Sequence, residues 1–103
     1  MTATQFNIFT RAVLFVTIRC SIPISDLDSS CRRAPVVFAR NILIHILRHQ
    51  ASMTLQEIAL LLKRHHTAIF HSLQSLENDT QTDCAKGREV AALISEFSAR
   101  SNE

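Results

Sequence analysis

Apolar residues recur three and four positions apart along most of the chain, which is the spacing of one face of an α-helix. Residues 5–19 carry such a face. A second helix is predicted from Pro35 to about His49, because proline suits the first helical position, where its missing amide donor costs nothing. A last amphipathic helix is predicted over residues 85–98, and its apolar face consists of Val90, Leu93, Ile94 and Phe97.

The connections between these segments are polar. The helical pattern breaks at residues 20–30, where Pro23 blocks continuation of the helix and Ser25 is expected to cap a single helical turn. Residues 29–33 are expected to form a polar, basic loop. Residues 78–84 are expected to form another polar loop, with Asp83 as a helix cap.

The stretch from Ser52 to Leu76 has the outline of a helix-turn-helix. Thr54 and Glu57 form a capping box, which starts a helix by satisfying its first unpaired amides. Polar residues break the apolar pattern at 63–66, and a second stripe follows. That stripe consists of Ile69, Phe70, Leu73 and Leu76. A short helix, a turn of about three residues and a second helix are therefore predicted here.

Composition favours the same fold class. The chain has 103 residues with a single Gly and two Pro, which disfavours an all-β fold with its frequent Gly-rich turns. We predict one all-α domain over residues 1–103, a small bundle of about five or six helices that contains the helix-turn-helix.

Neither a membrane protein nor a secreted protein is indicated. No segment approaches the roughly 18 apolar residues of a membrane span, and Arg11 interrupts the first apolar stretch, which argues against a signal peptide. The three cysteines lack a CxxC spacing, which favours free thiols in a reducing cytosol. A cytoplasmic protein without cofactors is expected.

The charges are unevenly distributed although the net charge is only +2. Residues 32–71 hold six Lys and Arg residues against one acid, Glu57, and include all five histidines. From residue 76 onward, six acids face three basic residues. A basic middle beside an acidic end is expected where one face of a protein meets a polyanion such as DNA.

Four motifs along residues 11–77 resemble the DNA-binding domain of the bacterial replication initiator DnaA. Residues 20–27 occupy the place of its tyrosine-glycine-valine-serine type turn and short helix. Residues 29–33 match its serine- and arginine-rich loop, and residues 54–58 its serine-leucine-proline-glutamate-isoleucine motif. Residues 65–71, which run His-His-Thr-Ala-Ile-Phe-His, stand where the family has an aspartate-histidine-threonine-threonine-valine signature, usually followed by leucine-histidine. The resemblance implies an all-α, TrpR-like helix-turn-helix fold from a bacterial protein.

This sequence departs from the family pattern at the signature. His65 replaces the aspartate, Ala68 replaces the second threonine, and the preceding glycines are absent in a turn one residue shorter. A base preference different from the usual initiator box is therefore expected. No phosphate-cradling glycine loop exists, and a stand-alone domain without the ATPase is expected, with no enzyme activity and no small-molecule substrate.

The resemblance and the side-chain chemistry together suggest which residues contact double-stranded DNA. The base-contacting candidates are His65, His66, Thr67, Ala68 and Arg32. An imidazole can donate to guanine, a threonine methyl can pack on a thymine methyl, and arginine favours a narrow minor groove. The phosphate-contacting candidates are Arg33, Arg40, Asn41, Leu55, Gln56, Lys63, Arg64 and His71. The alternative for the two adjacent histidines is that they merely start a surface helix. The expected role is origin binding in replication initiation, or transcription control, with the protein at the nucleoid when bound.

The sequence also suggests three other hypotheses. His45 and His49 have a spacing that can chelate zinc, but neither a HExxH run nor a cysteine pair accompanies them, so no metal site is expected. Cys31 with a histidine lacks a third orienting group for catalysis. The functional alternative is a protein-interaction module that keeps the fold without DNA binding. It would dock a partner, or a second copy, through the apolar face of residues 85–98.

Overall fold

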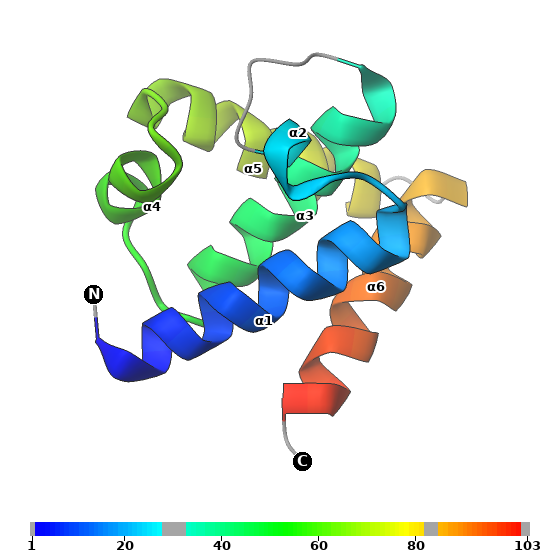
Figure 1. Ribbon diagram of the computed structural model, residues 1–103. Coiled ribbons are helices and arrows are strands. Elements are labelled where there is room, and N and C mark those ends of the chain that lie inside the picture. The colour runs from blue at the N-terminus through cyan, green and yellow to red at the C-terminus, as the bar shows by residue number, and fades with distance from the viewer. Residues whose placement is uncertain (1, 28–32, 82–84, 102–103) are drawn as a thin grey trace.

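The computed structural model describes residues 2–27, 33–81 and 85–101, and these ranges contain six helices and no strand (Figure 1). The helices are α1 (Ala3–Cys20), α2 (Ile24–Leu27), α3 (Ala34–His49), α4 (Leu55–Leu62), α5 (His66–Gln81) and α6 (Ala85–Ser101). The prediction of a small all-α bundle is confirmed. None of the described helices is long and apolar enough to cross a membrane.

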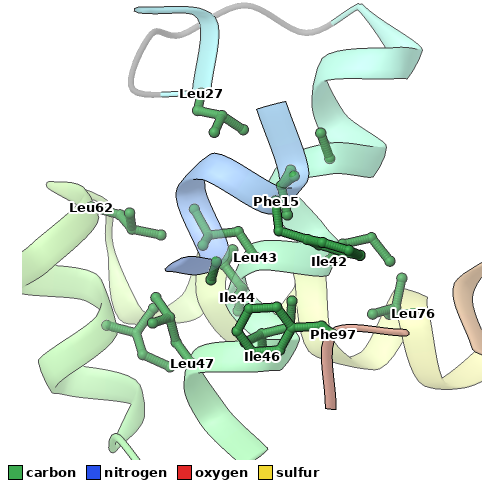
Figure 2. Close-up of a cluster of buried hydrophobic side chains, with 14 of the residues drawn as sticks. Phe15, Leu27, Ile42, Leu43, Ile44, Ile46, Leu47, Leu62, Leu76 and Phe97 are labelled. Carbon is green, nitrogen blue, oxygen red and sulfur yellow. The ribbon is translucent and has the colours of Figure 1, made fainter. Parts of the chain in front are cut away.

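Helix α3 is the centre of the bundle and contacts each of the other five helices. Its residues Ile42, Leu43, Ile44, Ile46 and Leu47 are all at most 1% exposed, so α3 is buried on more sides than a simple amphipathic stripe predicts. Figure 2 shows these side chains surrounded by residues of the other helices. The rings of Phe15 and Phe97 meet edge to face with centroids 5.5 Å apart, which joins α1 to α6 beside α3.

Local sequence signals explain where the helices begin. Pro35 lies in the first turn of α3, as predicted. At the start of α4, Glu57 N–H donates to Thr54 Oγ1 at 3.2 Å, and Thr54 N–H donates to Glu57 Oε1 at 3.1 Å. The predicted capping box is therefore present, and it fixes the entry into the helix-turn-helix.

Several expectations were wrong in detail. Helix α5 continues to Gln81, through residues 78–81 that were expected to form a loop; the Asp83 cap lies outside the described residues. Phe70 is 49% exposed although it was expected in the buried stripe. Ile69 is fully buried, and the next residue points about 100° further round the helix, away from the core.

The apolar face of α6 is also not the docking surface that the alternative function requires. Val90, Leu93 and Phe97 are 0%, 7% and 2% exposed and belong to the main hydrophobic core. Ile94 is half-buried against the same core. These side chains complete the fold, so they are not available to a partner or to a second copy.

Candidate DNA interface

The turn of the helix-turn-helix is closed by main-chain hydrogen bonds without the help of glycine. Arg64 N–H donates to Ala59 O at 2.9 Å and Lys63 N–H donates to Leu60 O at 3.4 Å, the pattern of a Schellman motif. Lys63 adopts the left-handed conformation, with φ 56° and ψ 46°, at a position that usually favours glycine. The lysine therefore holds this turn at a conformational cost, and its side chain is exposed.

His65 has a structural role at the start of α5. Thr67 N–H donates to His65 Nδ1 at 3.2 Å, so the imidazole satisfies one of the amides that the first turn of a helix leaves unpaired. This bond requires a neutral imidazole with its proton on Nε2. Sequence reasoning treated His65 only as a base-contacting candidate. The signal for the cap was its place directly before the helix, where the family has aspartate, a preferred capping residue.

Helix α5 presents the other signature residues to solvent. His66, Thr67, Ala68 and His71 are exposed, whereas Ile69 between them is fully buried and holds the helix against the core. The rings of His65 and His66 stack with centroids 4.4 Å apart and an interplanar angle of 29°.

Phe70 lies on the same solvent-exposed part of α5. Its ring meets that of His71 edge to face, with centroids 5.9 Å apart. Sequence reasoning missed Phe70 as a surface residue because it was assigned to the buried stripe. Its helical phase relative to Ile69 was the signal that could have found it.

An open hollow lies where α4 meets the start of α5. It brings together residues that are expected to contact bases and residues that are expected to contact phosphates. Its polar lining consists of Gln56, Lys63, Arg64, His65 and His66, and its apolar lining of Ala59 and Leu60. Gln56 and Lys63 are exposed, and Arg64 is half-buried. Leu55, at the first position of α4, is also half-buried. The hollow is thus a basic surface beside the start of α5.

The basic segment before α3 is only partly described. Arg32 lies outside the described residues. Arg33 directly precedes α3, and its guanidinium Nη2 forms an ion pair with Asp26 Oδ2 at 3.1 Å. The Arg33 side chain is still 70% exposed. Within this basic segment, Arg33 is therefore a described residue that is accessible to solvent and to a ligand.

Arg40 occupies a different environment from the one expected for a phosphate contact. The residue is 7% exposed, and its guanidinium donates from Nε to Leu27 O at 3.1 Å and from Nη2 to Asp26 O at 3.2 Å. These two carbonyls belong to the end of α2, where a short helix cannot satisfy them itself. Burial and these bonds place the Arg40 charge inside the fold. Neighbouring Asn41 is half-buried.

His45 and His49 stack on α3 with ring centroids 4.3 Å apart. Burial, and to a lesser extent the charge of His49, lowers the pKa of His45 to about 4, and its Nδ1 atom is buried without a hydrogen-bond partner. Across the described ranges, no group of three or more His, Cys, Asp or Glu residues is arranged to hold a metal ion.

The described thiol is that of Cys20, since Cys31 and Cys84 lie outside the described residues. Cys20 is half-buried, and burial raises the pKa of its thiol, with a smaller contribution from Glu89. A raised pKa disfavours the thiolate that a nucleophilic cysteine needs.

Comparisons with known proteins give one positive result. Residues 13–76 match the family described as "Bacterial dnaA protein helix-turn-helix". No curated protein and no solved structure matches the chain. The matched region is well over half of the 103-residue chain, and it runs from α1 through the helix-turn-helix to Leu76 in α5. The chain therefore belongs to the bacterial DnaA helix-turn-helix family and is a DNA-binding helix-turn-helix protein of that family.

Proposed function

We propose that this protein binds double-stranded DNA sequence-specifically, with the start of α5 in the major groove. The observation that carries the proposal is the arrangement of α5. His66 and Thr67 are exposed in its first turn beside the basic turn, whereas Ile69 anchors the helix to the core. A recognition helix is expected to present its N-terminal residues to base edges in this way.

Under this proposal, each residue at the start of α5 makes a different contact with the bases. His66 would donate from its imidazole to guanine O6 or N7, and Thr67 would pack its methyl group on a thymine methyl. Ala68, also exposed, can make only the methyl contact. His65 is a weaker candidate for base contact because its Nδ1 already accepts the Thr67 amide, which leaves the Nε2 edge for a base.

The surrounding basic residues would contact phosphates. Lys63, Arg64 and His71 flank the start of α5, and Arg33 lies before α3 with Asn41 further along that helix. At the start of α4, the Thr54 side chain caps the Glu57 amide. We propose that the main-chain amides of Leu55 and Gln56 face a phosphate there, where the helix dipole favours an anion. These contacts supply affinity, and Arg32 would add a minor-groove contact.

We propose a biological role on the basis of the family. Binding at a replication origin, or at sites that control transcription, agrees with the DnaA-type domain. The changes at His65 and Ala68 imply a target different from the usual initiator box, because they alter the donors and methyl groups at the recognition helix.

The test is selection of duplexes from a random pool, followed by anisotropy titration of the selected duplex. His66→Ala is expected to lose about 1–3 kcal/mol on that duplex and to lose discrimination against changes at one base pair. Lys63→Ala is the matched control, since a lost phosphate contact weakens binding to all duplexes alike and reduces the salt slope by about one. No detectable binding even at low salt would overturn the proposal and favour a protein-interaction module.

A further inference from the structure

Arg40 is a buried charged residue that direct DNA contact does not explain. Two hydrogen bonds of its guanidinium reach the carbonyls of Asp26 and Leu27, the last two residues of α2. A buried guanidinium is costly unless its donors are well placed, and bonds from a charged donor are stronger than neutral ones. The planar fork of arginine suits two neighbouring carbonyl oxygens better than the single ammonium of lysine. Arg40 therefore fixes the end of α2 against α3.

Asp26 is held from two sides. Its main-chain carbonyl accepts from Arg40 at 3.2 Å, and its carboxylate accepts from Arg33 at 3.1 Å. The Asp26 side chain is 27% exposed, whereas that of Arg33 is 70% exposed. One end of this chain of contacts is therefore inside the core and the other is at the surface.

We propose that Arg40 is a positioning residue for DNA binding, which holds Asp26 so that its carboxylate orients Arg33 toward the DNA. The inference rests on the proposed function and concerns the route by which Arg40 acts. A restrained arginine loses less side-chain freedom when it binds a phosphate than an unrestrained one does. Arg33 remains accessible while it is restrained, because most of its side chain is exposed.

The experiment is a double-mutant cycle between Arg40→Met and Arg33→Ala, measured as the Kd for the duplex that the wild-type protein selects. Each single change is expected to weaken binding about two- to tenfold. In the Arg40→Met background, Arg33→Ala should cost less than about twofold, because the orientation it depends on is already lost. Fully additive effects would overturn the proposal and indicate that Arg40 only stabilises the fold.

Arg40→Lys separates positioning from a direct phosphate contact. Lysine keeps the charge, so a direct contact would largely retain both affinity and salt slope. Under the proposal, Arg40→Lys binds as weakly as Arg40→Met, and both lose about one unit of salt slope through the weakened Arg33 contact. Wild-type affinity for Arg40→Lys would contradict it.

Arg48→Met is the matched control, because Arg48 is on the same helix and also donates to a main-chain carbonyl, that of Met53 at 3.0 Å. The effect of Arg48→Met on the Kd should add to that of Arg33→Ala.

Titrations are run under conditions where circular dichroism shows that each variant is folded. If no Arg40 variant folds, Asp26→Ala tests the last link: Arg33→Ala should cost less in that background, and an unchanged or larger cost would overturn the proposal. Absence of DNA binding by the wild-type protein would instead overturn the proposed function.

Discussion

The imidazole of His65 caps the helix that begins one residue later, since its Nδ1 atom accepts the Thr67 amide at 3.2 Å. His65 stands where the family has aspartate, which is a preferred capping residue, and it caps the helix with a ring in place of a carboxylate. The same ring stacks on His66. His65 thus contacts both of the next two signature residues: its ring stacks on that of His66, and its Nδ1 atom accepts the amide of Thr67.

Removing the cap should destabilise the protein. His65→Ala is expected to lower the free energy of unfolding by about 1 kcal/mol, and His65→Asp should retain most of the stability, because aspartate is a preferred capping residue. Urea unfolding followed by circular dichroism measures both. His66→Ala is the control, since His66 is exposed and makes no cap bond among those described. Equal losses for His65→Ala and His66→Ala would contradict the cap.

Replacing Lys63, whose backbone is left-handed, with glycine should change stability and DNA binding in opposite directions. Lys63→Gly should raise the free energy of unfolding by about 0.5–1 kcal/mol, because glycine adopts φ 56° without the steric cost of a Cβ atom. The same change removes a positive charge beside the start of α5 and should weaken DNA binding. Lys63→Ala keeps the Cβ, so it should weaken binding without the gain in stability. A stability gain with both variants would argue against strain at this position.

Much of the fold follows from local sequence signals. The helical period predicted the main helices, and Thr54, Glu57 and Pro35 predicted where two of them begin. These signals lie within a few residues of the feature that they determine. The helix-turn-helix was found in the same way, because both of its helices carry a period of three and four.

The environment of a residue was harder to predict where it depends on distant parts of the chain. Arg40 looks like a surface charge in its own helix, and its burial follows from carbonyls 13 and 14 residues earlier that need donors. The apolar residues of α6 look free to dock a partner in the sequence, but α5, α3 and α1 pack against this helix in the fold. Both errors have one cause: a helical pattern reveals which face is apolar, but not what covers it.

The different environments of Phe70 and Leu76 in α5 should appear in their contributions to stability. Leu76 is 1% exposed, so Leu76→Ala is expected to cost about 2–5 kcal/mol through lost burial and a cavity. Phe70→Ala should cost about 1 kcal/mol or less, because nearly half of the residue already faces solvent. Denaturant unfolding of both variants makes the comparison. A cost for Phe70→Ala as large as that for Leu76→Ala would place its ring in the core.

Protonation of His45 should make the folded state less stable in mild acid. Burial lowers its pKa to about 4 in the folded protein, whereas an unfolded chain has a histidine pKa of about 6.5. Between these pH values the unfolded chain binds a proton that the folded protein does not, so stability is fully present above pH 6.5 and falls as the pH decreases toward 4. Because the side chain is only partly buried, the loss is expected to be on the order of 1 kcal/mol.

The measurement is the difference in unfolding free energy between wild type and His45→Leu at several pH values. Carboxylates titrate in both proteins and cancel in the difference, which should shift in favour of the variant as the pH falls from about 6.5 to about 4. His49→Leu is the matched control. It removes only the smaller cause of the lowered pKa, so it should retain most of the wild-type pH dependence. The difference in unfolding free energy between wild type and His45→Leu could instead stay constant over this pH range. That result would mean that His45 is protonated as readily in the folded protein as in the unfolded chain.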